Sequence, residues 1–319
     1  MDTHLGGMRM RKSDATQMDI LAVHKNRKMD RRGRSMKIAL IADVHANLVA
    51  LEAILEVIRE EKPDEIISLG DQVNLGPCPR ETLELLKEHG VRCLIGNHER
   101  YVLEVLAGKP EYEDANFDLV RFTAKKVTAE DIAFPELIQI GRICFCHALP
   151  GNDHFPIYNP SVALPQLRKF SFPETDHIIC GHGHNPTHYR FPGLTIDSIG
   201  SSGCMDEGAA STAMFTMMIT DGEETVLYPR FVPYDSGKVI ESYWQSSLVE
   251  FSPIMAHLSC LQMITNQSYL VPFTKLARSI AAENGKKAID ASVLMAADAC
   301  FPWPDGLRTE AYWAKNRPK

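Results

Sequence analysis

The sequence has no long hydrophobic run. Within its 319 residues, no stretch approaches the roughly 18 consecutive apolar residues of a membrane helix, so we expect no transmembrane segment and no membrane partner. The first 35 residues also lack the apolar centre of a secretory signal peptide. With 45% hydrophobic and 24% charged residues, the composition is ordinary for a globular protein and excludes disorder over most of the chain.

Closely spaced cysteine pairs are also missing. The eight cysteines include no C-x-x-C pair, which argues against a zinc ribbon or a thioredoxin-type redox site. Cys144 and Cys146 lie two residues apart in an apolar run, so we interpret them as buried thiols on one face of a strand. Cysteines spread in this way favour a reducing compartment, and we expect a cytoplasmic protein.

Positive charge is scarce in the body of the chain. The net charge is −7, but residues 1–35 hold nine basic and four acidic residues, so residues 36–319 carry a net charge of −12. Such an acidic body is a poor candidate for a broad nucleic-acid surface, which needs many cations to neutralise phosphates. If the substrate is a phosphate, something other than the net charge must attract it.

Three parts of the chain differ in pattern. Residues 1–35 are polar and basic, and we interpret them as a disordered or non-native extension before a functional start at Met36, or alternatively as an arm that binds a partner. Residues 36–234 alternate regularly between strand-like and helix-like segments. Residues 235–319 are predicted to form a helical C-terminal extension, which would either cover a cleft and set substrate size or mediate contacts in a homo-oligomer.

The first part of this body predicts a parallel sheet. We expect strands over 37–42, 65–69 and 91–95, a helix that begins after Asn47, and a second helix over 81–89. This rhythm is typical of βαβ units. Residues 110–135 are expected to be helical, with Asp221 and Gly222 in a later hairpin turn. Further short strands are expected over 137–140, 143–147, 177–180, 194–198, 212–220 and 225–228, which together suggest two packed sheets flanked by helices.

Side chains of the kinds that bind metal ions follow five of these strands. They belong to Asp43-Val44-His45, Gly70-Asp71, Gly96-Asn97-His98-Glu99, His147 and Gly181-His182-Gly183-His184. In an open α/β sheet, ligands bind beyond the carboxyl ends of the strands, so the five segments are expected to meet. Each alone is a weak or moderate signal, but all five in order indicate a site. Carboxylate, amide and imidazole ligands without thiolate suit Mn²⁺, Fe or Zn²⁺ better than Ca²⁺.

The sequence resembles the calcineurin-like metallophosphoesterases over about residues 36–230. The resemblance is carried by the runs ADVHANLVALEAIL, SLGDQVNLGPCPRE, LIGNHERY, CFCHALPG and CGHGHNPTH. The early part is most similar to the small bacterial branch, which includes phosphodiesterases of the YfcE type. The resemblance implies an α/β fold in four αββα layers, with two mixed β-sheets flanked by helices.

The resemblance also implies the roles of the site residues. One metal ion would be held by Asp43, His45, Asp71 and His184, and a second by Asp71, Asn97, His147 and His182. Asp71 would bridge the two ions. His98 is not a ligand in this family; it contacts the phosphate and would protonate the leaving group, which makes Asp71 and His98 the expected catalytic residues. Asn97, His98 and the adjacent Arg100 are the candidates for substrate contact.

These residues predict a metal-dependent phosphoesterase. Two divalent cations roughly 3.5–4 Å apart would share a hydroxide that attacks the phosphorus in line, and they would neutralise the phosphate of the substrate. We expect a small phosphodiester or a nucleotide as the substrate, with Mn, Fe or Zn as the metals and Ni or Co as further candidates. A phosphomonoesterase, a dinucleoside-polyphosphate hydrolase or a non-catalytic scaffold on the same fold stays open as an alternative.

Two segments depart from the family pattern. Phosphoprotein phosphatases of the family carry Asp-Arg-Gly where this chain has Asn74-Leu75-Gly76, so the phosphate-binding arginine is missing and a phosphoprotein substrate is disfavoured. Small bacterial members have Asn-Pro-Gly-Ser after the last histidines, whereas this chain has Asp197-Ser198-Ile199-Gly200-Ser201. We therefore expect the loop that lines the site to differ from that of its relatives.

Overall fold

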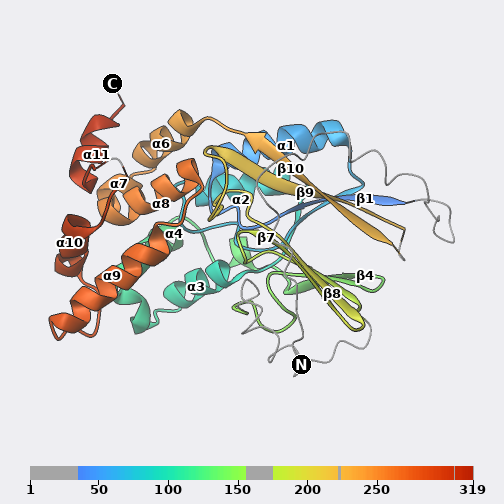
Figure 1. Cartoon of the computed structure of the whole chain (residues 1–319), viewed down its shortest axis with the longest axis horizontal. Helices are drawn as coiled ribbons and strands as arrows, with labels where there is room; N and C mark the ends of the chain where they lie inside the picture. Colours follow the sequence, from blue (N-terminus) through green and yellow to red (C-terminus); the bar gives the residue numbers. More distant parts are fainter. Residues whose placement is uncertain (1–34, 156–174, 222–223, 305, 319) are drawn as a thin grey trace, which may run out of the picture.

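Two five-stranded β-sheets form the centre of the molecule in a computed structural model of the chain (Figure 1). The structure describes residues 35–155, 175–221, 224–304 and 306–318. The basic extension predicted up to residue 35 lies outside the described residues except for its last position, and so does Gly222 of the predicted hairpin turn.

The first sheet brings three predicted strand ends to one edge. Its order is β10-β9-β1-β2-β3, with β1 (Met36–Ile41), β2 (Glu65–Ser68), β3 (Arg92–Cys93), β9 (Thr212–Thr220) and β10 (Thr225–Pro233). β1, β2 and β3 are parallel neighbours, as the predicted βαβ rhythm requires, whereas β9 runs antiparallel to β1 and β10. The carboxyl ends of β1, β2 and β3 therefore point the same way.

The second sheet supplies two more strand ends. Its order is β4-β5-β6-β8-β7, with β4 (Leu137–Ile140), β5 (Ile143–Cys146), β6 (His177–Cys180), β7 (Pro186–Phe191) and β8 (Leu194–Ile199). β5, β6 and β8 are parallel, and the two edge strands are antiparallel to their neighbours. The predicted α/β fold of two mixed sheets flanked by helices is confirmed.

The strand β7 was not predicted. It begins at Pro186, which lacks the N–H that a central strand needs, and no side chain along it is fully buried. A strand at the edge of a sheet needs only weak apolar patterning because one side of it is unpaired. The sequence signal for this strand is correspondingly weak.

The two sheets are held together by an apolar core. Ile38 and Leu40 of β1 point toward the second sheet, where they share a buried cluster with Phe145 and Ile179. Ala39 and its alternate neighbours on β1 point to the other face of the first sheet, as the period of a strand dictates. Because both faces of β1 are covered by apolar side chains, the sequence of this strand is one continuous apolar run.

Helices α1 (Leu48–Glu61) and α2 (Pro79–Glu88) cover the outer face of the first sheet. The predicted cap is confirmed, because Asn47 Oδ1 accepts a hydrogen bond from the backbone of Ala50 at 3.2 Å. α1 buries Leu51 and Ile58, among others, at helical spacing. Because Asn47 ends the turn that carries the first two candidate ligands, this cap also fixes that turn.

Residues 97–135 are less regular than predicted. They form α3 (Asn97–Leu106), α4 (Asp118–Ala124) and three short 3₁₀ turns, η2 (Pro110–Glu113), η3 (Ala115–Phe117) and η4 (Glu130–Ile132). The expected helical character of 110–135 is therefore only partly confirmed. Asp114 gives one reason, because its side chain accepts from the backbone of Asn116 and so supports a local turn in place of a longer helix.

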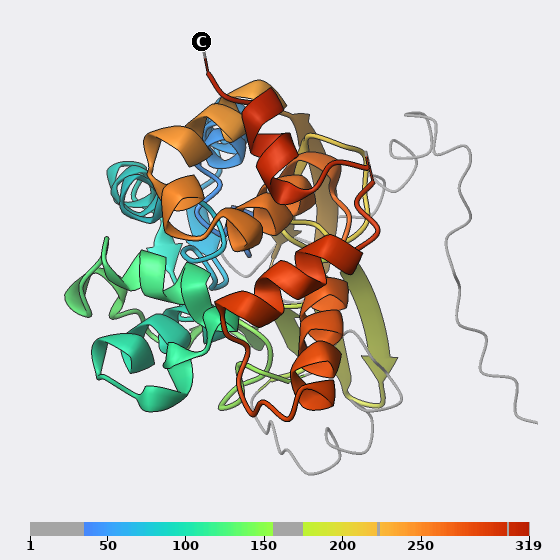
Figure 2. The ribbon, with the colours of Figure 1, turned by 90° about the vertical axis from the view of Figure 1, so that its left-hand side faces the viewer.

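The C-terminal helices gather at one end of the sheets (Figures 1 and 2). They are α6 (Ser236–Gln245), α7 (Leu248–Phe251), α8 (Pro253–Thr265), α9 (Leu270–Glu283), α10 (Ala291–Cys300) and α11 (Thr309–Lys315). Their buried cluster includes Leu119 and Phe122 of α4, and Ser252 donates a 2.6 Å hydrogen bond to Asp118. The C-terminal helices thus pack directly against α4, which follows α3 and its candidate ligand Asn97 in the chain. The domain boundary at residue 234 stays a prediction.

Candidate metal centre

The predicted segments meet where parallel strands of both sheets end. The turns after β1 and β2 carry Asp43, His45 and Asp71, and the start of α3 carries Asn97 and His98. The second sheet contributes His147 after β5 and the two histidines after β6. Carboxylate and imidazole atoms of these residues fall into three groups whose members lie within 4.8 Å of one another: Asp43, His45 and His184; His45, Asp71 and His98; and Asp71, His147 and His182.

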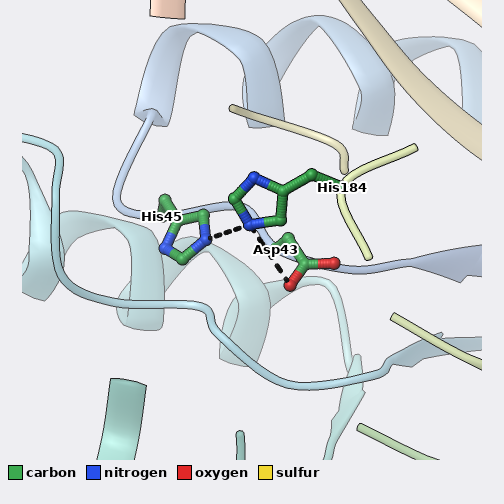
Figure 3. A group of neighbouring side chains, drawn as sticks. All are labelled: Asp43, His45 and His184. Atoms are coloured by element: carbon green, nitrogen blue, oxygen red, sulfur yellow. Dashed lines mark hydrogen bonds and ion pairs between the residues drawn. The ribbon is translucent and has the colours of Figure 1, made fainter. Parts of the chain in front are cut away.

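The first group joins two strands of different sheets (Figure 3). His45 Nε2 lies 3.0 Å from His184 Nε2, and His184 Nε2 lies 3.9 Å from Asp43 Oδ1. Two imidazole nitrogens that bind one cation at about 2.1 Å each lie roughly 3 Å apart. The separation of the two rings therefore fits a shared divalent cation.

The group of Asp71, His147 and His182 surrounds the amide oxygen of Asn97. Asn97 Oδ1 lies 2.8 Å from His147 Nε2 and 3.0 Å from His182 Nδ1. His147 Nε2 is also 3.3 Å from Asp71 Oδ2, and this same oxygen is 3.9 Å from His45 Nε2. Asp71 therefore lies between the two groups, as a bridging ligand must.

Five of the candidate ligands have a left-handed backbone. Their φ angles are 51° at Asp43, 52° at His45, 56° at Asp71, 62° at His182 and 51° at His184. Non-glycine residues in this region cost about 1 kcal/mol or more each and persist where the surrounding structure forces them. Here the backbone is held across the sheet, for example by His45 N, which donates to Asp71 O at 2.9 Å. The clustering of this strain on candidate ligands indicates a functional site.

Neighbouring groups orient the ligands. His147 Nδ1 donates to the Leu69 carbonyl at 2.8 Å, which turns Nε2 toward Asp71 in the way a metal-binding histidine is usually oriented. Both carboxylate oxygens of Asp43 accept from the backbone of His182, at 3.1 and 3.0 Å. A Cβ on Gly96 would lie 2.1 Å from Asp71 Oδ1, so only glycine permits this approach.

The electrostatics of the site suit a cation. Burial opposes ionisation of Asp71, but the surrounding histidines hold its pKa well below the usual value. Burial also disfavours the charged form of His147, yet the Asp71 carboxylate raises its pKa to about 10. Burial raises the pKa of Asp43 to about 7 and lowers that of His182 to about 3. Among the described residues, the ion pairs of Asp43 and Asp71 are with histidines and not with lysine or arginine, so divalent cations would supply the positive charge that these buried carboxylates lack.

His98 is oriented by a residue that the sequence did not single out as a site residue. Asn74 Nδ2 lies 2.6 Å from His98 Nδ1, and because an amide nitrogen only donates, Nδ1 accepts. The proton of the neutral ring then sits on Nε2, which lies 3.9 Å from Asp71 Oδ2. Burial lowers the pKa of His98 to about 4, which favours this neutral form.

Glu99 is a second residue whose part in the site was not predicted, although it belongs to the Gly-Asn-His-Glu motif. Its side chain is 0% exposed and accepts from the backbone of Asp71 and Gly96 at 2.8 Å and of Val73 at 3.1 Å. It therefore fixes the turn after β2 to the start of α3. The motif signals its importance, but only the structure shows that it acts through backbone groups.

Arg100 lies beside the centre with its charge already paired. It contacts Asp153, and its Nη2 lies 2.7 Å from Glu136 Oε1. Together with His147, these residues line a small cavity of about 190 Å³. Contact between Arg100 and a substrate stays a prediction.

Comparison with known proteins identifies the family of the region that carries this centre. Residues 36–194 match the family model described as calcineurin-like phosphoesterase. An uncharacterized protein of Methanocaldococcus jannaschii, MJ0912, is 31% identical over 160 residues, which are 47% of this chain and 63% of that protein. The match thus spans less than two thirds of the relative's length.

Two solved structures share the fold. A metallophosphoesterase from Sphaerobacter thermophilus is 24% identical with a TM-score of 0.58, and the match covers 72% of this chain and all of that one. The hypothetical protein PH1004 from Pyrococcus horikoshii is 18% identical with a TM-score of 0.58, over 73% and 99% of the two chains. None of the described helices is long and apolar enough to span a bilayer. Through residues 36–194, this chain belongs to the calcineurin-like phosphoesterase family.

Proposed function

We propose that this chain is a hydrolase of phosphodiesters or nucleotides that depends on two divalent cations. The observation that carries the proposal is the convergence of seven oxygen and imidazole ligands from five strand ends into two groups that share Asp71. A structural role would not require five of these residues to adopt a left-handed backbone.

The geometry supports a division of the ligands between two ions. Asp43, His45 and His184 would hold the first ion, Asn97, His147 and His182 would hold the second, and Asp71 would contribute to both. When bound, such cations lower the pKa of a water molecule and neutralise the oxygens of a phosphate. Mn, Fe and Zn fit this mixture of hard oxygen and imidazole donors, with Ni and Co as further candidates.

His98 is the residue that we assign to the leaving group. Its neutral Nε2–H would hydrogen-bond the ester oxygen that departs and stabilise the negative charge that develops there, and Asn74 would keep the ring in this tautomer through Nδ1. His98 N donates to Asp71 Oδ1 at 2.9 Å, so the backbone that carries this donor is fixed to the bridging carboxylate. The imidazole and the bridging ligand are thereby held as one unit.

Leu75 also supports a diester substrate over a monoester. It stands where phosphoprotein phosphatases of the family carry an arginine, so this position supplies no positive charge. A phosphomonoester carries close to two negative charges at neutral pH, whereas a diester carries one. A site with one cationic side chain fewer therefore favours the diester.

The test is hydrolysis of bis-p-nitrophenyl phosphate beside p-nitrophenyl phosphate. Protein stripped with a chelator is assayed before and after addition of Mn²⁺, Fe²⁺, Co²⁺, Ni²⁺ or Zn²⁺, with Asp71→Asn as the control. We expect turnover that returns with metal in the unmodified chain and not in the variant, with the diester preferred. Absence of turnover with all five metals would overturn the proposal.

A further inference from the structure

A second cavity opens beside the metal centre and leads to the C-terminal helices. Its volume is about 510 Å³, and we call it the outer pocket. Asn74 and His98 line it together with Leu75, Tyr101, Tyr112, Asn116, Phe117, Leu119, Val120, Met255, Leu270, Val271, Thr274, Lys275 and Arg278. Since His98 belongs to both sites, a group bound in the outer pocket lies next to the reacting bond.

One face of α9 forms a wall of this pocket. Val271, Thr274, Lys275 and Arg278 follow the i, i+3, i+4, i+7 spacing that places side chains on one side of a helix. The other side of the helix carries Phe273 and buried alanines that pack into the C-terminal core. α9 thus presents a separate polar and cationic face to the outer pocket.

The charge of this wall is unbalanced. No aspartate or glutamate is among the described residues that line the outer pocket. Lys275 and Arg278 are both exposed, and neither forms an ion pair or side-chain hydrogen bond with another residue of the described ranges. In a chain with a net charge of −7, two cations without a carboxylate at one cavity favour an anionic ligand.

The opposite wall is aromatic. The ring centroid of Tyr101 lies 5.4 Å from that of His98 and 6.0 Å from that of Tyr112, and Tyr112 is 4.7 Å from Phe117. These rings line the cavity together with Val271 and other apolar side chains. Such surfaces bind flat or apolar organic groups by stacking and dispersion.

The two walls are tied together. Thr274 donates a 2.9 Å hydrogen bond to Asn116 Oδ1, and the backbone of Ala115 donates to the Ile289 carbonyl at 2.8 Å. Asp114 Oδ2 accepts from Ile289 N at 2.8 Å. Contacts from α9 and from the segment that follows it therefore fix the helix relative to residues 114–116 beside the aromatic wall, so the pocket is preformed.

We propose that the outer pocket selects the organic part of the substrate. It would take a phosphoester whose organic group carries an apolar ring, packed against Tyr101 and Tyr112, and a second anionic group held by Lys275 and Arg278. The inference rests on the proposed function, because the first phosphate is assigned to the metal centre. It also assigns the C-terminal helices a role in specificity, one of the two roles open from the sequence.

The test uses two substrates that differ only in the second anion. They are the 5′-p-nitrophenyl phosphate ester of thymidine and the same ester with a 3′-phosphate, compared with bis-p-nitrophenyl phosphate as a small reference. The variant is Lys275→Ala with Arg278→Ala. The matched control, Lys238→Ala with Lys287→Ala, removes the same charge from exposed positions outside the pocket.

We expect the unmodified chain to favour the 3′-phosphorylated ester. The pocket variant should raise KM for that ester about tenfold while leaving the 3′-hydroxyl ester and the small reference within about twofold, because the lost contacts are remote from the reacting bond. The control should behave as the unmodified chain. Equal effects on all three substrates, or equal effects of the two double variants, would overturn the inference.

A binding measurement separates this inference from the proposed function. Calorimetric titration with thymidine 3′,5′-bisphosphate requires no turnover. If the chain hydrolyses no ester but binds this compound more weakly in the pocket variant than in the control, the pocket assignment stands and the proposed reaction fails. If the small reference is hydrolysed but the two variants bind the bisphosphate equally, the reaction stands and the pocket assignment fails.

Discussion

Glu99 shows how one buried carboxylate supports the centre without being a ligand. Its two oxygens accept from three backbone N–H groups in the turns around Asp71, and no water reaches them. In Glu99→Gln, an amide nitrogen replaces one carboxylate oxygen. This nitrogen cannot accept a hydrogen bond, so a buried N–H donor loses its partner. We expect the free energy of unfolding to fall by about 1–3 kcal/mol.

The measurement is urea unfolding in the absence of metal, followed by circular dichroism. Glu84→Gln, on the exposed side of α2, makes the same chemical change where water can replace the lost contact, and it should alter stability by less than about 0.5 kcal/mol. Equal stability of the two variants would mean that the hydrogen bonds of Glu99 contribute nothing net.

Asn74 should act on the reaction only through His98. Its amide fixes the tautomer of the imidazole by a 2.6 Å contact to Nδ1. We expect His98→Ala to lower kcat by about 10²–10³-fold, as loss of a hydrogen-bond donor to developing negative charge does, and Asn74→Ala to lower it by a smaller factor. In the double variant, the Asn74 change should have no further effect. A double variant whose losses multiply would show that Asn74 contributes independently.

At the scale of residues, the ligand types could be predicted but their supports could not. Asp43, His45 and Asp71 follow strands, and strand ends can be read from apolar runs. The contact of Asn74 with His98 joins residues 24 positions apart through two turns with their own backbone angles. Nothing in the local pattern specifies those angles, so such contacts become visible only when the fold is known.

Among the elements, α9 links the C-terminal core to the outer pocket. Phe273 is 0% exposed and packs against Phe301 and Trp303, with ring centroids 5.3 and 6.1 Å away. We expect Phe273→Ala to lower the free energy of unfolding by about 3–5 kcal/mol, because it leaves a cavity in a packed core. Phe231→Ala is the control, since that ring is 59% exposed on the edge strand β10.

The accuracy of the predicted element boundaries depends on how deeply each segment is buried. The helix after Asn47 was predicted well because a cap and a buried stripe agree. The strand predicted over 225–228 extends to Pro233, since an edge strand continues along β9 without apolar alternation. Residues 110–135 form one short helix and three short turns in place of a longer helix, because side chains such as Asp114 satisfy the backbone there. Local patterns therefore predict the centre of the fold better than its edges.

For the whole molecule, the candidate metal centre joins the two sheets. Its candidate ligands come from turns after β1 and β2 in one sheet and after β5 and β6 in the other, so bound cations would cross-link both halves of the core. An ion that binds only the folded chain stabilises it by about 2.7 kcal/mol at 100 times its Kd. In a chain of this size, that corresponds to a rise in Tm of roughly 4 °C.

Thermal unfolding of the chelator-treated chain with and without Mn²⁺ measures this rise. We expect Asp71→Asn to show little of it, because the variant loses the carboxylate that both groups of ligands share. Asp153→Asn is a suitable control, since its carboxylate pairs with Arg100 outside the three groups, and it should keep the full rise. A similar rise in Asp71→Asn would place the stabilising ion elsewhere. Such a result would mean that the stabilisation by the ion does not depend on the centre around Asp71, because another site would then supply it.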